Sequence, residues 1–253
     1  MGLPPTASEA VAAALVSWAG VSGVDQVVEL GAGTGEIGLH LVRLPLRYVG
    51  LDNSPGMLDI FRSKAGEHAP ELIVADCDAP WPLDDGSAAV VFASRVIHLL
   101  RPDHVVRETL RVVRPGGFLM LGRVQREPGS LKDSLQRQRQ ALLRERGIQV
   151  RQGERGNREV IARCEAAGCT SLGRRVAAEW SGETCVAAIL VAWESLSRMG
   201  SVDVDPPTRA AILGDLREWA RAEYGDPEAM QPFREQFVID IVRVPALDVS
   251  HHG

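Results

Sequence analysis

The chain has 253 residues, of which 45% are hydrophobic, and a formal net charge of −5 at pH 7. This length can bury one large core, or a core with an elaborate cap. The negative charge gives no general attraction to nucleic-acid phosphates. No apolar run approaches the ~20 residues that a membrane span needs, and the first residues lack a signal-peptide pattern. We therefore expect a cytoplasmic protein with no nucleic-acid partner and no membrane span, either a monomer or a homodimer.

The four cysteines, at positions 77, 164, 169 and 185, form no C-x-x-C pair and have no histidine set nearby. Structural zinc sites and disulfide frameworks both need such closely spaced patterns. The cysteines therefore predict reduced thiols, as in a cytoplasm, and no metal site.

The predicted elements begin with a helix over about residues 8–18, followed by a short strand at 27–30. Gly31, Gly33 and Gly35 come next, and an apolar periodic segment follows them. This order indicates a strand, a tight loop and a helix. Glycines allow the backbone to bend sharply and let a ligand approach without meeting a Cβ atom. The loop is therefore predicted to hold a small molecule.

Two nucleotide-like ligands fit this loop. The segment 33–38 matches the dinucleotide fingerprint G-x-G-x-x-G, with Asp52 close to the expected acidic position. The segment 29–35, with the pattern E-x-G-x-G-x-G, instead resembles the first motif of the class I methyltransferases, which bind S-adenosylmethionine (SAM). An acid beside the glycines would repel a pyrophosphate, whereas SAM carries a sulfonium and an ammonium and no phosphate. Glu29 therefore favours SAM over NAD.

Two more strands are predicted to end in acidic residues. The first, over 47–52, ends at Asp52, whose carboxylate can accept hydrogen bonds from both hydroxyls of a ribose. Ser54 as a cap and Pro55 in the first turn then predict a helix. The second of these strands is expected over residues 72–78, with a polar end.

A buried fourth strand is predicted over 88–94 and a fifth over 118–122, after a helix that ends in the R-P-G-G turn at 114–117. The whole order, over about residues 9–124, resembles the class I SAM-dependent methyltransferases. It is most similar to their small-molecule group, of the methyltransferase type 11/25 kind. The signatures that carry the resemblance include L-D-x-S-x-x-M-L at 51–58 and R-V-x-R-P-G-G-x-L-x-L at 111–121.

The resemblance implies an α/β fold with a Rossmann-like, seven-stranded, mostly parallel sheet flanked by helices. Its seventh strand would insert antiparallel between the fifth and the sixth. It also implies SAM as the cofactor, S-adenosylhomocysteine as its product, and binding at the carboxyl ends of the strands. Glu29 and the glycine loop would hold the methionine half, Asp52 the ribose and Asp76 the adenine amino group. The cofactor-binding set implied is Glu29, Gly31, Ala32, Gly33, Gly35, Asp52, Asn53, Met57, Asp76, Cys77 and Ser94.

The second half of the chain is less regular. Residues 126–156 are rich in Arg, Gln and Glu, and we expect there a solvated helix over one face of the sheet rather than a buried element. A core helix is predicted over 157–167, a sixth strand over 173–180 and a seventh over 237–244.

This organisation predicts a methyltransferase core at 1–180 and 237–253 and a helical cap inserted at 181–236. One cap helix is expected to begin at Glu183-Thr184, and a second to follow Pro206-Pro207 and end near Tyr224. In small-molecule methyltransferases such an insertion covers the cofactor and builds the substrate pocket. The aromatic residues of this segment either line that pocket or pack the cap onto the core.

The reaction implied by the resemblance asks little of the protein. Holding a donor methyl and a nucleophile at near-attack distance supplies roughly 7–11 kcal/mol of the barrier. A base is needed only if the acceptor must lose a proton. His98, just past the fourth strand, is the candidate catalytic base, because histidine titrates in the right range; its other interpretation is a structural or cofactor-side residue. His104 is expected at the surface.

The sequence therefore predicts a SAM-dependent methyltransferase that moves a methyl group to a small-molecule acceptor (on oxygen, nitrogen or carbon) by in-line displacement. Two alternatives remain open. One is a SAM-binding protein without catalysis, and the other is an NAD(P)-dependent oxidoreductase that uses the same glycine loop. The sequence does not reveal the acceptor.

Overall fold

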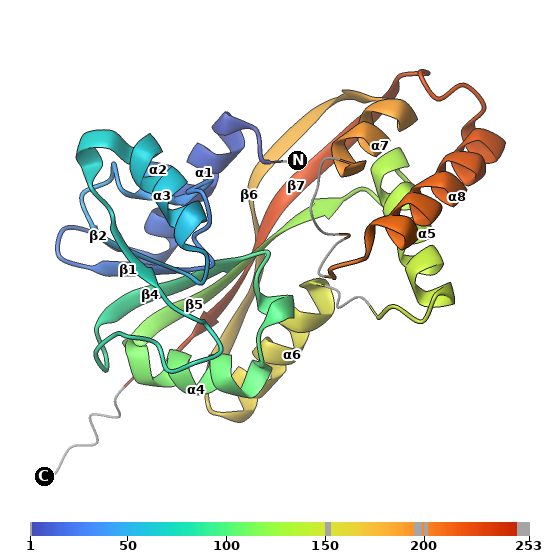
Figure 1. The fold of residues 1–253 in the computed structure, drawn as a ribbon. Helices are drawn as coiled ribbons and strands as arrows, with labels where there is room; N and C mark the ends of the chain where they lie inside the picture. The colour runs from blue at the N-terminus through green and yellow to red at the C-terminus, as the bar shows by residue number, and fades with distance from the viewer. Residues whose placement is uncertain (1, 150–152, 195–198, 200–201, 247–253) are drawn as a thin grey trace, which may run out of the picture. The chain divides into compact units, whose positions relative to one another are not determined.

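The computed structural model describes residues 2–149, 153–194, 199 and 202–246. Seven strands and eight α-helices alternate along this part of the chain (Figure 1), with short 3₁₀ turns at Gly66–His68 and Ile97–Leu99. The order is α1 (Pro5–Ala19), β1 (Gln26–Leu30), α2 (Gly38–Leu41), β2 (Arg47–Asp52), α3 (Pro55–Ala65), β3 (Glu71–Val74), β4 (Ala88–Ser94), α4 (Pro102–Val112), β5 (Val113–Arg126), α5 (Leu131–Glu145), α6 (Gly153–Ala166), β6 (Thr170–Thr184), α7 (Val186–Glu194), α8 (Pro206–Tyr224) and β7 (Gln231–Arg243).

The seven strands form one sheet in the order β3-β2-β1-β4-β5-β7-β6. The pairs β3-β2, β2-β1, β1-β4 and β4-β5 are parallel. β7 lies between β5 and β6 and runs in the opposite direction (Figure 1). The predicted fold class, a Rossmann-like and mostly parallel sheet with an antiparallel seventh strand, is confirmed.

The chain divides into two units, and the division passes through β5, β6 and β7. We call residues 2–123, 153–178 and 237–246 the sheet unit, and residues 124–149, 179–194 and 202–236 the helical unit. Residues 124–149 thus group with the segment that contains α7 and α8. The expectation that 181–236 forms a cap over the core stays a prediction.

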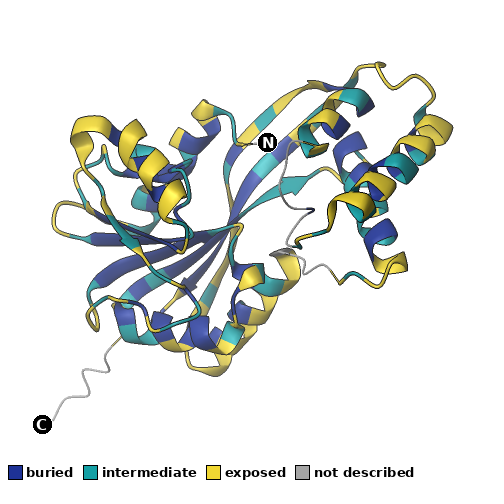
Figure 2. Cartoon of the chain, viewed as in Figure 1, coloured by how far each residue is buried: buried dark blue, intermediate teal, exposed yellow. Residues whose placement is uncertain are grey.

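In the sheet unit, the central strands are buried along their whole length. All five residues of β1 are buried, as are the first six of β4. α1, α2 and α3 lie on one face of the sheet, and α4 and α6 lie on the other (Figure 1). Figure 2 shows that the strands between these helices are mostly buried, whereas the helices carry many exposed residues. Because both faces are covered, these strands carry apolar runs instead of an alternating pattern.

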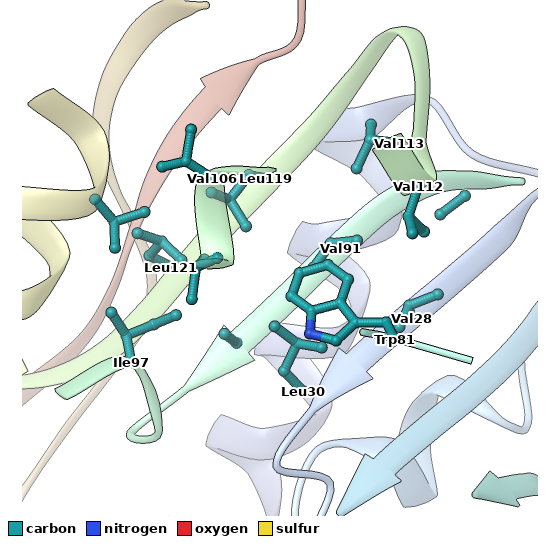
Figure 3. Close-up of a cluster of buried hydrophobic side chains, with 14 of the residues drawn as sticks. Val28, Leu30, Trp81, Val91, Ile97, Val106, Val112, Val113, Leu119 and Leu121 are labelled. Atoms are coloured by element: carbon teal, nitrogen blue, oxygen red, sulfur yellow. The ribbon is translucent and has the colours of Figure 1, made fainter. Parts of the chain in front are cut away.

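The core on the α4 and α6 face is a continuous apolar cluster (Figure 3). Trp81 is 2% exposed and lies in it beside the strand residues Val28, Leu30 and Val91. Its ring nitrogen donates to the carbonyl oxygen of Cys77 at 3.0 Å, so the indole is buried without an unpaired donor. This anchors the loop that follows β3 to the sheet.

The helix expected within residues 126–156 is present as α5, but the expectation that it is solvated rather than a buried element is wrong. α5 contributes Leu131, Leu135, Leu142 and Leu143 to a buried core that it shares with α7 and α8. These positions follow each other by 4, 7 and 1 residues, so they form one apolar face about 120° wide on the helix. The many charged residues of the segment occupy the rest of its surface, and they outweighed the partial helical periodicity that these leucines give the sequence.

β6 and β7 are both longer than expected. The sixth strand was predicted over 173–180 and runs from Thr170 to Thr184, while the seventh was predicted from Phe237 and begins at Gln231. The two strands are neighbours in the sheet, and they extend into the residues that flank the predicted ranges. The helix expected to begin at Glu183 therefore begins at Val186.

Among the described residues, no helix combines the length and the apolar character that crossing a membrane requires.

Replacing Leu135 by Ala should lower the free energy of unfolding by about 2–5 kcal/mol, because a fully buried leucine leaves a cavity between α5 and its neighbours. Denaturant unfolding followed by circular dichroism would measure this loss. Val191→Ala on α7, where the side chain is 63% exposed, is the matched control and should change stability little. Equal effects of the two substitutions would contradict the buried position of α5.

Candidate functional site

The strand register brings the expected site residues to one edge of the sheet. Leu30 pairs with Leu51 on one side and with Ala93 on the other, so the three lie in one row across β2, β1 and β4. The residues that follow these three along the chain are Gly31, Asp52 and Ser94. They therefore lie at the same level of the sheet. The parallel strands thus place a glycine, a carboxylate and a hydroxyl side by side at their carboxyl ends.

The glycine loop is fixed by its backbone. The amides of Gly31 and Ala32 both donate to the carbonyl oxygen of Leu51, at 2.8 and 3.0 Å, and the amide of Gly35 donates to that of Ala32 at 3.0 Å. Gly31, Gly33 and Gly35 all have positive φ, between 54° and 80°. Only glycine adopts such angles without strain, so the alternation of glycines follows from the shape of the loop.

The three glycines differ in what surrounds them. A Cβ on Gly31 would lie 3.0 Å from Val96, and one on Gly35 would lie 2.5 Å from the ring of Phe61. At Gly33, by contrast, the nearest atoms would be 3.9 Å away, one of them the sulfur of Met57. Met57 itself is 48% exposed. Gly33 thus leaves open the space in front of the loop, which a side chain would fill.

The helix after the loop is shorter than the sequence indicated. α2 has only four residues, Gly38–Leu41, and its first turn carries no acidic side chain. A Cβ on Gly38 would collide with Tyr48 and Phe61, so this position lets α2 pack closely on β2 and α3. A helix this short has little macrodipole, so the loop's backbone and the neighbouring side chains must hold any ligand.

Asp52 connects the glycine loop to the following helix. One carboxylate oxygen accepts from the amide of Gly33 at 2.9 Å, and the other from the amide of Ser54 at 2.8 Å. The Ser54 hydroxyl in turn accepts from the amide of Met57, at 3.4 Å, and caps α3. Each oxygen of Asp52 still has acceptor capacity, since a carboxylate offers about four lone-pair sites.

Glu29 is buried beneath the loop, with 4% of its surface exposed. The hydroxyl of Tyr48 donates to its carboxylate at 2.6 Å. Burial raises the pKa of Glu29 from 4.5 to about 8, although the hydrogen bond from Tyr48 and the charge of Arg95 act against the shift. At neutral pH and without a ligand, Glu29 is therefore mostly protonated. Its attraction for a cation, inferred from the sequence, requires that the cation displace this proton.

Asp76 and Cys77 lie past the end of β3, which stops at Val74. The strand was expected to run to residue 78. The amide of Ala75 donates to the carbonyl oxygen of Asp52, and Asp76 then turns the chain by accepting from the amide of Asp78 at 2.9 Å. Cys77 is buried under the glycine loop, and burial raises the pKa of its thiol to about 11. A protonated thiol is no nucleophile at neutral pH.

At the end of β4, Arg95 has a φ of 58°, which is unusual for a residue other than glycine. Its guanidinium pairs with Glu36, whose carboxylate also accepts from the amide of Leu3 at 2.6 Å. The hydroxyl of the preceding Ser94 is buried and has no hydrogen-bond partner among the described residues. An orphaned hydroxyl at this edge is one a ligand could satisfy.

His98 lies in the 3₁₀ turn Ile97–Leu99 and is half-buried. A Cβ on Gly156 of α6 would lie 3.2 Å from the Cα of His98, so α6 packs directly on this turn. The role of His98 as a base stays a prediction. His104 was expected at the surface and this is wrong, because it is 2% exposed, with its ring 2.8 Å from the carbonyl oxygen of Ala79.

Sequence reasoning missed three residues that shape this site. Tyr48 holds Glu29, Phe61 closes the loop behind Gly35, and Val96 packs on Gly31. Only Tyr48 had a signal, since a carboxylate expected inside a sheet needs a buried donor nearby. The other two are ordinary apolar residues in the sequence.

The segment 28–121, which carries this whole arrangement, matches the family model described as "Methyltransferase domain". These residues are therefore similar to a methyltransferase domain. The match begins in β1 and ends in β5, so it includes the glycine loop, Asp52, Asp76 and His98.

Curated relatives resemble this methyltransferase domain over part of their length. The chain is 35% identical over 106 residues to an uncharacterized methyltransferase of Mycobacterium tuberculosis, and the match covers 42% of each chain. It is 32% identical over 99 residues to a demethylmenaquinone methyltransferase of Clavibacter sepedonicus, over 38% of this chain and 40% of the relative. The chain thus spans less than half the length of the curated relatives it matches.

Solved structures share the fold over nearly the entire chain. The YcgJ protein of Bacillus subtilis has a TM-score of 0.60 at 13% identity, covering 93% of this chain and 98% of that one. A geranyl diphosphate methyltransferase in complex with SAM has a TM-score of 0.52 at 16% identity, covering 93% and 84%. At these identities the likeness concerns the fold.

Comparing Gly33→Ala with Gly35→Ala should show which glycine is required by packing inside the fold and which one borders open space for a ligand. Each should lose about 1–2 kcal/mol for a positive φ, and Gly35→Ala should lose about 1–3 kcal/mol more because of the contact with Phe61. Thermal unfolding of both variants measures the difference. Gly20→Ala, where φ is 61° and no atom lies within 4 Å, is the control for the backbone cost alone. A Gly33→Ala variant as unstable as Gly35→Ala would show that the space is filled.

The raised pKa of Glu29 predicts that this group destabilises the ligand-free fold as the pH rises. Between about pH 4.5 and 8 the folded chain holds a proton that the unfolded chain has released, so stability falls across this window. Glu29→Gln lacks the titration, and its stability relative to the wild type should increase by a few kcal/mol from pH 5 to pH 8.5. Urea unfolding at several pH values tests this. Glu67→Gln, at an exposed acid, should show no such trend.

Proposed function

We propose that this chain transfers a methyl group from SAM to a small-molecule acceptor. The observation that carries the proposal is the placement of Asp52. Its carboxylate is buried, is oriented by the amides of Gly33 and Ser54, and stands in register with the glycine loop. A carboxylate held in this way keeps acceptor capacity for the two hydroxyls of a ribose.

The residues present fit SAM. The open space at Gly33 suits a ligand that lies against the loop, and the buried Glu29 suits a cationic group above it. Asn53 and Met57 would contact the nucleoside, Asp76 the adenine amino group, and Cys77 would contribute its backbone. The free hydroxyl of Ser94 would lie at the far side of the cofactor. Bound SAM supplies a methyl carbon already activated by the positive sulfur.

The raised pKa of Glu29 connects cofactor binding to a proton. An ammonium or sulfonium near the carboxylate favours the ionised form, and so would lower the pKa again. Binding of SAM would then release a proton from Glu29 at neutral pH. A pyrophosphate has the opposite charge and would keep Glu29 protonated, so it gains nothing from this residue.

The protein's part in the transfer would be positional. Residues that fix the donor and the acceptor in line lower the barrier without acting on the bonds themselves. With SAM bound, the acceptor's nucleophilic atom would take the methyl group by in-line displacement, and the electron pair of the broken bond would leave with the sulfur of the neutral product. If the acceptor loses a proton, His98 is the proposed base, and a bell-shaped or shifted pH profile of the rate in the wild type but not in His98→Ala would support that.

Calorimetric titration with SAM and, separately, with NAD tests the cofactor assignment. We expect SAM to bind in the micromolar range and Asp52→Ala to weaken its binding by about tenfold or more, because hydrogen bonds to a charged group are lost. Asp59→Ala on α3, where the carboxylate is 70% exposed, is the matched control and should bind as the wild type does.

NAD binding without SAM binding would contradict the methyltransferase proposal and support an oxidoreductase instead. SAM binding that does not depend on Asp52 would contradict the site described above. With SAM bound, a screen of small molecules for methyl transfer then distinguishes an enzyme from a SAM-binding protein without catalysis.

A further inference from the structure

The helical unit contains a partly buried basic cluster that lies outside the segment 28–121 matched by the family model. Lys132, Gln136 and Arg139 are spaced by 4 and 3 residues on α5, so they lie along one side of the helix. Arg126, at the end of β5, donates to the side-chain oxygen of Gln136 at 2.5 Å. We call Arg126, Lys132 and Arg139 the basic cluster.

One carboxylate, that of Glu235 on β7, serves two members of the basic cluster. Arg126 pairs with one of its oxygens at 2.9 Å and Lys132 with the other at 3.0 Å. The second oxygen also accepts from the ring nitrogen of Trp180 at 3.1 Å. Glu235 is 6% exposed and therefore cannot turn towards another cation. Its negative charge is thus already shared between two cations.

Arg139 has no acid of its own. In the part of the chain that the structure describes, it makes no ion pair, and its buried Nε atom has no hydrogen-bond partner. Its guanidinium lies over the ring of Trp193 on α7, with its central carbon 4.2 Å from the ring centre, which offsets part of the desolvation cost.

Burial, together with the charge of Arg126, lowers the pKa of Arg139 to about 10, so Arg139 is still charged at neutral pH. Arg126 and Lys132 share the carboxylate of Glu235, and Arg139 adds a third positive charge beside them. A buried charge without a counter-charge costs several kcal/mol. A ligand of opposite sign would supply the missing counter-charge.

The surroundings of the basic cluster are aromatic as well as charged. The ammonium of Lys132 lies 3.4 Å from the centre of the Phe233 ring, and Trp180 and Trp193 contact the cluster through Glu235 and Arg139. A ligand here would meet a guanidinium fork that suits planar or tetrahedral oxyanions. Next to it, it would meet rings that suit an apolar body.

We propose that the helical unit binds an acidic ligand, a carboxylate or a phosphate carried on an apolar body, at Arg139 and its basic neighbours. The ligand's charge and its aromatic contacts follow from the basic cluster itself.

The test uses four probes that all carry an octyl chain: nonanoate, octyl phosphate, octanol and octyltrimethylammonium. Calorimetry and tryptophan fluorescence on the full chain should detect binding of at least one acid, tighter than that of the alcohol and the cation. Arg139→Gln should weaken acid binding by at least about tenfold. Arg137→Gln on the same helix, where the side chain is 63% exposed and pairs with Asp133, should leave acid binding unchanged. Failure of both acids to bind at millimolar concentration overturns the proposal.

The thermal stability of the same variants gives a second readout. Removing an uncompensated buried charge should leave the unfolding midpoint of Arg139→Gln equal to or above that of the wild type. A clear fall in this midpoint, with Arg137→Gln unaffected, would make Arg139 a structural residue and overturn the proposal.

Titration with SAM on the same preparations keeps the two conclusions apart. Intact SAM binding without acid binding removes the anion site and leaves the proposed function. Acid binding without SAM binding retains the anion site and contradicts the proposed function.

Discussion

The common register of the parallel strands is the constraint on which the site depends. Because Leu30, Leu51 and Ala93 share one row, the residues that follow them meet at one edge, although they lie 21 and 42 positions apart along the sequence. The carbonyl of Leu51 then fixes the glycine loop by accepting from two of its amides. A slip of one residue in either pairing would turn Asp52 or Ser94 to the other face of the sheet. The ordered geometry of the loop is thus a property of the sheet, and α2 contributes little to it.

The second feature is that the site is assembled at an energetic cost. Glu29 is buried with one hydrogen bond, from Tyr48, and its pKa rises because the charged form is poorly solvated there. Arg95 adopts a positive φ beside it, and Ser94 keeps a hydroxyl without a partner among the described residues. Energetically unfavourable arrangements of this kind are typical of binding sites, where a ligand supplies the missing interaction.

The helical unit shows the same principle in another form. Its core of leucines and isoleucines is an ordinary apolar cluster, but the charged side of α5 is turned to Glu235, Trp180 and Trp193 rather than to water alone. Two cations there share one carboxylate, and Arg139 stacks on an indole with no acid paired to it among the described residues. The acidic ligand proposed above would supply this missing charge.

The sequence by itself determined the order of the strands and helices of the first half, the glycine loop, and the family signatures around Asp52 and Asp76. It could do so because these features are local: a strand, a turn and a cap each depend on neighbouring residues. The fold class also followed from the sequence, since the alternation of strands and helices allows few sheets. Only the tertiary structure decided that residues 131–143 are part of a core, that Tyr48 holds Glu29, and that Phe61 closes the loop. It also decided the ionisation of Glu29 and the lack of an acid for Arg139. Burial and charge balance are set by contacts between distant segments, and no periodicity or composition encodes them.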